Sequence, residues 1–185
     1  VLVTHDHADH CHGIDDIRPI AQAKGEPVPL LARADVLERL EKRFRYIFID
    51  TRFYRAVMRS VPVEDGLRVG ESALRFVDQP HGGITSLGIR IDEGARSAGY
   101  AIDFHEMTDD MFAMYRGVDV WISDCLRRAP HPTHAHLDKT LSWIERIKPE
   151  RAILTHMNHT LDYEVARRRC PPGVEPGYDG MIIEL

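Results

Sequence analysis

The sequence predicts an α/β fold, because apolar segments of strand length alternate with segments of helical periodicity along all 185 residues. The length fits one domain, and a hydrophobic content of 43% is enough to bury a core. We find no internal repeat and no low-complexity segment. We therefore expect residues 1–185 to form a single domain.

The first third of the chain is predicted to hold two strands and two helical regions. They are a buried strand at 1–4, a helix at 13–17 that ends at Pro19 or shortly after it, a strand at 27–32, and a helical region at 33–60 with a break near Asp50. The apolar residues of the last region recur at helical spacing.

From residue 67 to 103 the pattern changes to alternating strands, with a turn at Gly94. The remaining predicted elements are a helix at 108–116 capped by Thr108, a strand at 118–125, an amphipathic helix at 136–147, a strand at 152–154 that leads into His156, and a last strand at 181–183.

The charge balance excludes some partners. Lys and Arg total 24 against 29 Asp and Glu, a net charge of −5, which argues against a general nucleic-acid binder. The negative net charge is compatible with a small anionic substrate, because bound divalent metal ions make the local charge of a site positive. Cys11, Cys125 and Cys170 are too few and too scattered for a disulfide framework. With no signal peptide or long apolar run, we expect a cytoplasmic protein with no membrane partner.

The segment Thr4–His10 holds three histidines and two aspartates in seven positions. His5 and His7 are two residues apart at the end of a strand, so both project from the same face. Asp9 and His10 follow where the chain turns into a helix, in reach of a second ion. This density of ligand-type side chains predicts a metal site.

Three further candidates each follow a predicted strand: His81, Asp103 and His156. Side chains on loops at one edge of a sheet are held by a rigid scaffold while their polar ends stay accessible. Together with the first segment they form an ordered pattern, His-x-His-x-Asp-His followed by single His, Asp and His residues.

This pattern resembles the metallo-β-lactamase superfamily. The resemblance implies a four-layer αββα sandwich, whose first strands would precede Val1. It also implies two divalent ions: His5, His7 and His81 hold one, Asp9, His10 and His156 hold the other, and Asp103 bridges them. The mixture of imidazole and carboxylate ligands is compatible with Mn²⁺ or Zn²⁺.

Within the superfamily the finer resemblance is to the phosphoribosyl cyclic phosphodiesterases of PhnP type. The segments that carry it are 5–19, 81–82, 86–88, 100–103, 131–134 and 154–157. It implies that His134 faces the substrate phosphate and protonates the leaving oxygen; the alternative is a capping or loop residue before the helix at 136–147. Asp124 either orients a histidine or caps a helix. In this branch His159 would join a structural zinc site with N-terminal cysteines, which this chain does not contain.

The resemblance implies a metal-dependent phosphoric diester hydrolase acting on a small phosphodiester, either a phosphoribosyl cyclic phosphate or a nucleotide-like compound. A hydroxide bridging the two ions would attack phosphorus in line, with Asp9 hydrogen-bonded to the nucleophile and His134 as the proton donor. Nucleic acid is not the expected partner, and a homodimer is left open.

Other functions remain open. A tRNase Z-like nuclease shares the ligand set, but it predicts a basic exosite or a protruding arm, and the sequence shows neither. Thioester or lactam hydrolysis is disfavoured, because His134 and the segment 86–88 resemble the phosphodiesterase branch. A metal-dependent nucleotide-binding module without turnover is the non-enzyme alternative. The segment 43–54, which mixes aromatic residues and arginines, forms either a lid over the site or a plain helix surface.

Overall fold

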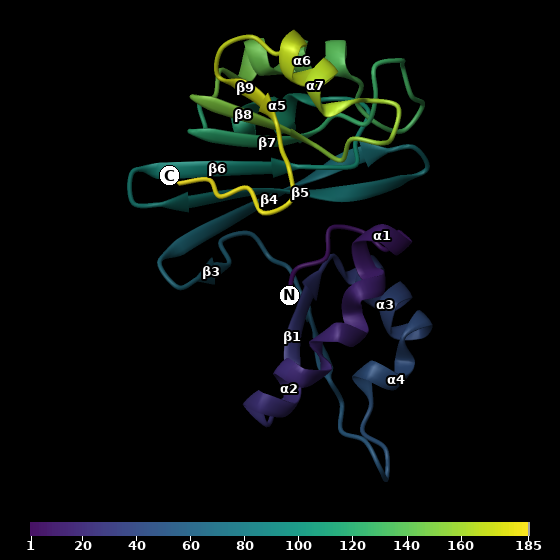
Figure 1. The fold of residues 1–185 in the computed structure, drawn as a ribbon. Helices are drawn as coiled ribbons and strands as arrows, with labels where there is room; N and C mark the ends of the chain where they lie inside the picture. The colour runs from purple at the N-terminus through teal and green to yellow at the C-terminus, as the bar shows by residue number, and fades with distance from the viewer. Residues whose placement is uncertain (185) are drawn as a thin grey trace. The chain divides into compact units, whose positions relative to one another are not determined.

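The computed structural model describes residues 1–184. The chain divides into two compact units, Val1–Glu64 and Asp65–Leu185, of which Leu185 itself is not described. Each unit has its own sheet, its own helices and its own apolar core, so the predicted α/β class is confirmed (Figure 1).

The first unit is built on a two-stranded parallel sheet. Its elements are α1 (Ala8–Cys11), the 3-10 helix η1 (His12–Ile17), α2 (Arg18–Lys24), β1 (Val28–Ala32), α3 (Ala34–Arg43), α4 (Arg45–Phe48) and β2 (Met58–Pro62). Helix α3 buries Val36, Leu37 and Leu40, which share one face at spacings of three and four residues. This apolar face packs with both strands into the core of the unit.

Three predictions for this unit need correction. Residues 1–4 are extended beside β1 but form only an isolated bridge, Leu2 to Leu31. Pro19 lies in the first turn of α2, where a missing N–H costs nothing, so it begins a helix that runs to Lys24. The helical region predicted to reach residue 60 ends at Phe48, and Met58 already starts β2.

The second unit is built on a seven-stranded mixed sheet of order β3-β4-β5-β6-β7-β8-β9. Its elements are β3 (Arg68–Val69), β4 (Ser72–His81), β5 (Ile84–Glu93), β6 (Arg96–Ala101), α5 (Asp109–Tyr115), β7 (Val120–Asp124), α6 (Leu137–Ile147), β8 (Arg151–Thr155), α7 (Tyr163–Arg169) and β9 (Val174–Pro176). Helices α5, α6 and α7 lie on one side of this sheet (Figure 1). Their apolar residues and those of the strands form one core.

Most predictions for the second unit are confirmed. Thr108 caps α5 by accepting a hydrogen bond from the N–H of Met111, and Gly94 has the positive φ that its turn requires. The prediction of a last strand is wrong: residues 181–183 form no strand, and the Ile182 side chain is 82% exposed. The edge of the sheet is taken instead by β9, which pairs with β8 and was not predicted. Helix α7 was not predicted either.

The sheet topology brings four strand ends to one edge. Strands β6, β7 and β8 are parallel, and β4 runs in the same direction because both it and β6 are antiparallel to β5. Their carboxyl ends lead to His81, Asp103, Asp124 and His156. The candidate ligands of the second unit therefore share one edge. Among the described residues, no helix is long and apolar enough to cross a membrane.

Candidate metal centre

Asp103 occupies the middle of the polar cluster in the second unit. Its Oδ2 lies 3.3 Å from Nε2 of His81, and its Oδ1 lies 3.3 Å from Nε2 of His156. The Asp103 side chain is only 2% exposed. One buried carboxylate thus presents a different oxygen to each of two histidines.

The orientation of His81 is fixed from its other ring nitrogen. Nδ1 of His81 donates to the carbonyl oxygen of Thr133 over 2.8 Å, because a carbonyl can only accept. A neutral ring with its proton on Nδ1 presents a lone pair at Nε2 to the Asp103 carboxylate. Two electron-rich atoms that face one another are stabilised by a cation, and such an outer hydrogen bond is typical of metal-binding histidines.

The backbone conformation also marks two of these residues, Asp103 and His156, as part of a functional site. Asp103 and His156 have φ values of 55° and 60°, in the left-handed region that residues with a Cβ seldom adopt. The hydroxyl of Ser86 donates to the carbonyl oxygens of Ile102 (3.0 Å) and Asp103 (2.8 Å) and so holds the first of these turns. Strained conformations of this kind cluster at functional sites.

Asp124 connects the cluster to His134. Its Oδ2 accepts a hydrogen bond from Nδ1 of His134 at 3.0 Å, and its Oδ1 lies 3.6 Å from Nδ1 of His156. Burial raises the pKa of Asp124, although the hydrogen bond from His134 and the charge of His156 oppose the shift. Helix α6 has His136 as its N-cap residue. Asp124 therefore contacts two histidines of the cluster and does not cap this helix.

His134 lies among the other histidines of this unit. Its ring centroid is 5.1 Å from that of His156, with nearly parallel planes, and 4.7 Å from that of His81. Ligand atoms of Asp103, His134 and His156 fall within 4.8 Å of one another. The structure thus brings together all the site residues predicted for the second unit.

The first unit holds its own cluster at the start of α1. The ring of His5 lies 4.6 Å from that of His7 and 4.4 Å from that of His10, centroid to centroid. Oδ2 of Asp9 is 3.4 Å from Nε2 of His10. His5 is fully buried, whereas His7 and Asp9 are exposed. The predicted segment therefore folds into a compact set of imidazole and carboxylate groups.

No role was predicted for Asp6, whose carboxylate contacts two arginines of α3. Its carboxylate lies 2.9 Å from Nε of Arg39 and 3.2 Å from Nη2 of Arg43, and Nη1 of Arg43 donates to the Asp6 carbonyl oxygen over 2.6 Å. Arg39 and Arg43 are four residues apart on α3, so they share one face of the helix. The spacing of the two arginines indicates that they can hold one acid together, but not that the acid is Asp6.

Cys11 packs as a small apolar side chain. It is buried in the core of the first unit, where burial raises the pKa of its thiol. A raised thiol pKa disfavours the thiolate, so this environment is that of a core residue and not of an activated nucleophile.

Both clusters consist of imidazole nitrogens and carboxylate oxygens, a donor set that suits Zn²⁺ and Mn²⁺. With the buried Asp103 between two histidines, the residues of the second unit fit a divalent metal ion.

Comparisons with known proteins identify the family of this chain. A family model of the beta-lactamase superfamily domain matches residues 1–157 and so continues across the boundary between the two units. A solved diphosphatase of the PhnP family is 32% identical with a TM-score of 0.88; the alignment covers all of this chain and 70% of that one. The short form of human tRNase Z is 14% identical with a TM-score of 0.71, over 99% of this chain and 77% of that one, which shows the fold alone.

Among curated proteins, an octanoyltransferase of Porphyromonas gingivalis is 24% identical over 186 residues. The match covers 98% of this chain, but the chain spans only 37% of the length of that protein. The family match over most of the sequence decides the assignment. The chain belongs to the metallo-β-lactamase superfamily, a group of metal-dependent hydrolases, and within it resembles the PhnP family.

Proposed function

We propose that this chain is a dinuclear metal-dependent phosphodiesterase that hydrolyses a small phosphodiester, a phosphoribosyl cyclic phosphate or a nucleotide-like compound. The observation that carries the proposal is the Asp103 carboxylate, which offers one oxygen toward His81 and the other toward His156, each at 3.3 Å. A carboxylate placed in this way is suited to bridge two ions.

The proposed ligands come from both clusters. One ion is assigned to His5, His7 and His81, the other to Asp9, His10 and His156, and Asp103 is shared. This assignment rests on the superfamily pattern together with the compactness of each cluster within its own unit.

A pair of divalent ions, when bound, makes hydroxide available at neutral pH and neutralises phosphate charge. The chain supplies the remaining functions. Asp9 accepts a hydrogen bond from the attacking water and so fixes its direction. Asp124 holds Nδ1 of His134, so Nε2 is the nitrogen that delivers a proton to the leaving oxygen.

The choice of a phosphorus substrate is supported by the PhnP-family relative, whose name describes a diphosphatase. A diphosphate and a phosphodiester share the centre that is attacked and differ in the leaving group. The octanoyltransferase name belongs to a protein of which this chain spans only 37%, and an acyl substrate is the alternative that it raises. A nucleotide-binding module without turnover is the non-enzyme alternative.

The test is a substrate panel with purified chain, stripped of metal and reloaded with either Mn²⁺ or Zn²⁺. The panel holds a chromogenic phosphodiester, a cyclic ribose phosphate, a nucleoside diphosphate and a thioester. We expect turnover of the diesters. Asp103→Ala and His81→Ala should lose metal content and activity together, while His134→Ala should keep its metal and lose turnover.

Glu145→Gln, an exposed substitution on α6, is the matched control and should behave as the parent protein. Full activity of Asp103→Ala would refute the dinuclear scheme. Hydrolysis of the thioester without any phosphodiester would refute the choice of substrate class, and metal binding without turnover on the whole panel would favour the binding module.

A further inference from the structure

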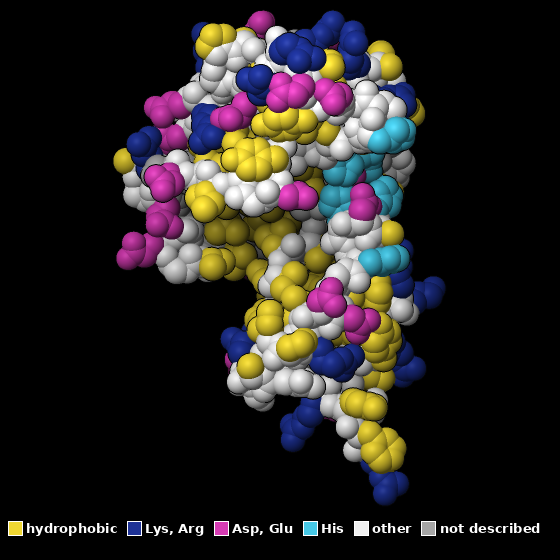
Figure 2. Space-filling model, viewed as in Figure 1, with side chains coloured by type: hydrophobic (Ala, Val, Ile, Leu, Met, Phe, Trp, Pro, Cys, Tyr) yellow, Lys and Arg dark blue, Asp and Glu magenta, His cyan; other side chains and the backbone are white. Residues whose placement is uncertain are grey.

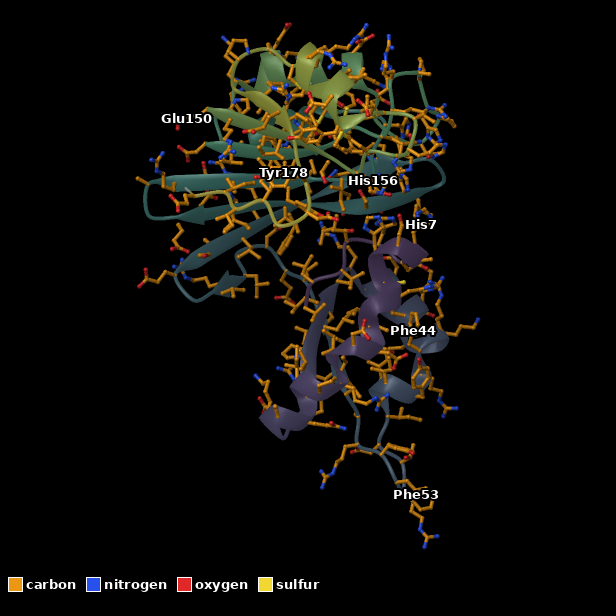
Figure 3. All side chains as sticks on the ribbon, viewed as in Figure 1. His7, Phe44, Phe53, Glu150, His156 and Tyr178 are labelled. Carbon is orange, nitrogen blue, oxygen red and sulfur yellow. The ribbon has the colours of Figure 1, made fainter. Side chains whose placement is uncertain are left out.

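The segment between α4 and β2, residues 49–57, forms a loop with Phe53 at its tip (Figure 3). Within the first unit, the tip and the labelled His7 lie at opposite ends (Figure 3). The loop therefore does not act as a lid over His7. Any ligand of this loop occupies a place separate from the metal-binding residues of its own unit.

The loop is held in a defined conformation by its own hydrogen bonds. The N–H of Thr51 donates to the carbonyl oxygen of Tyr54 (2.7 Å), and the N–H of Tyr54 donates back to Oγ1 of Thr51 (2.9 Å). The N–H of Ala56 donates to Oδ1 of Asp50 over 2.8 Å. The two side chains at the tip thus project from an ordered turn.

These side chains are large, aromatic and exposed, and Figure 2 shows hydrophobic and basic side chains together at the end of the loop. Phe53 is 81% exposed, Tyr54 69%, and Tyr46 on α4 51%. The guanidinium carbon of Arg52 lies 5.6 Å from the ring centroid of Phe53. Aromatic and arginine side chains grouped on a surface are typical of binding sites.

The surrounding segment is strongly basic. Residues 42–59 contain six lysines or arginines and one aspartate, a net charge of +5 in a chain whose total is −5. Arg43 is committed to Asp6, and the other five cations are exposed. Neighbouring acids reduce the charge only in part: Asp15 accepts a hydrogen bond from Tyr46 and pairs with Arg18. The net charge of −5 for the whole chain therefore does not reveal the excess of positive charge in residues 42–59.

A pocket of about 520 Å³ lies between α2 and the loop. Its lining includes Arg18 and Gln22 from α2, Glu26 just after α2, and Asp50, Phe53, Tyr54 and Arg55 from the loop. Of the two carboxylates, Glu26 lies 3.6 Å from Nζ of Lys24 and Asp50 accepts the N–H of Ala56. The volume falls in the range of small-ligand sites, roughly 300–1,000 Å³. Aromatic faces, guanidinium groups and hydrogen-bonding side chains are the groups that contact a base and its phosphate.

We infer that this loop and pocket bind single-stranded nucleic acid. Bases stack on Phe53 and Tyr54, the arginines on either side of them contact phosphates, and the pocket receives one nucleotide. The polar lining contributed by Gln22 and Asp50 favours hydrogen-bonded bases over lipid chains. The inference goes beyond the proposed hydrolysis and differs from the expectation, drawn from net charge, that nucleic acid is not a partner; the binding experiment decides between the two.

The test is fluorescence anisotropy of a labelled 12-nucleotide single strand with the full metal-loaded chain, with the length of the strand checked by gel after each titration. We expect affinity to fall as salt rises. Phe53→Ala combined with Tyr54→Ala should weaken binding by about 10- to 100-fold, because stacking carries much of the affinity. Arg55→Gln should weaken it less and reduce the salt dependence by about one phosphate contact.

The matched controls lie in the second unit, Tyr178→Ala for an exposed aromatic residue and Arg167→Gln for an exposed cation, and both should bind as the parent does. Hydrolysis of the chromogenic diester should be unchanged in the loop variants, which separates this inference from the proposed function. Three results would overturn it: unchanged affinity of the double variant, equal affinity for AMP and the strand, or binding of phosphatidylserine vesicles but not of the strand.

Discussion

Arg43 fixes the main chain at Asp6, between two candidate metal ligands: its Nη1 donates to the Asp6 carbonyl oxygen over 2.6 Å and its Nη2 lies 3.2 Å from the Asp6 carboxylate. His5 and His7 are the residues on either side. Helix α3 is thereby tied to the segment that carries the histidines, all within the first unit. An outer contact of this kind sets the direction of the ligands without touching a metal ion itself.

We predict that Arg43→Ala loosens metal binding by about 10- to 100-fold, the usual cost of losing an outer contact. Competition with a chromogenic chelator measures the affinity directly, without an activity assay. Arg43→Lys should be intermediate, because a lysine keeps the charge but cannot make both contacts. Lys42→Ala, one position earlier on the same helix, is the control and should bind metal as the parent does. Equal affinities of Arg43→Ala and the parent would show that the Arg43 contact is not needed for metal binding and that Arg39 alone is enough to hold Asp6.

We predict that Asp124→Asn lowers kcat to nearly the same extent as His134→Ala, by about 10²- to 10⁴-fold if His134 is the proton donor. Asparagine keeps the size of the buried side chain but removes the charge that holds Nδ1 of His134. The double variant should be no worse than either single variant, because residues that act as a unit are not additive.

The assay for these variants uses saturating metal, because Asp124 also lies 3.6 Å from Nδ1 of His156 and its loss can weaken metal binding. Circular dichroism checks that the fully buried position tolerates asparagine. Additive losses in the double variant would mean that Asp124 and His134 act separately.

Local patterns made the ligand segment and most elements predictable from sequence. Residues 4–10 were recognised by their density of histidine and aspartate side chains. Thr108 and Gly94 were recognised because helix caps and turns depend on residues close in sequence. Contacts between distant residues gave no such signal. Two features depend on which segments meet in three dimensions: the ion pairs between Asp6 and α3, and the pairing of β9 with β8 at the edge of the sheet. A short apolar run such as 181–183 is compatible with an exposed tail as well as with a strand.

Asp92 should make a pH-dependent contribution to stability. Burial alone would raise its pKa, but hydrogen bonds from Arg90 and Arg75 outweigh burial and hold the pKa below its ordinary value. A carboxylate whose pKa is lowered by folding stabilises the protein above the unfolded pKa, about 3.9, and the contribution disappears as the pH falls through the folded value. Asp92→Asn should therefore cost up to about 1 kcal/mol at pH 7, the scale of a partly exposed ion pair.

Urea unfolding of the parent and Asp92→Asn between pH 3 and pH 7 measures this contribution. Other titrating groups cancel in the difference between the two proteins, which should shrink below a pH of about 4. At 1 M salt the difference should also shrink at neutral pH. A difference that stays constant across the range would assign the effect to packing instead of charge.

Gly88 lies on β5 where no side chain fits. A Cβ at this position would be 2.2 Å from Oη of Tyr115 and 2.3 Å from Oε1 of Gln79. Both neighbours are fully buried, and Oη of Tyr115 also donates to the carbonyl oxygen of Tyr100 over 3.1 Å. Neither side chain can move away without losing its contacts.

We predict that Gly88→Ala destabilises the protein by about 1–3 kcal/mol, the usual cost of overpacking a core. Gly83→Ala is the matched control: nothing lies within 4 Å of its added Cβ, so its stability should change by less than about 0.5 kcal/mol. Adding Tyr115→Phe to Gly88→Ala removes the nearest clashing atom and should recover part of the loss. Thermal unfolding of the four proteins measures this, and a Gly88→Ala variant as stable as the parent would mean that the strand can shift to admit the methyl group.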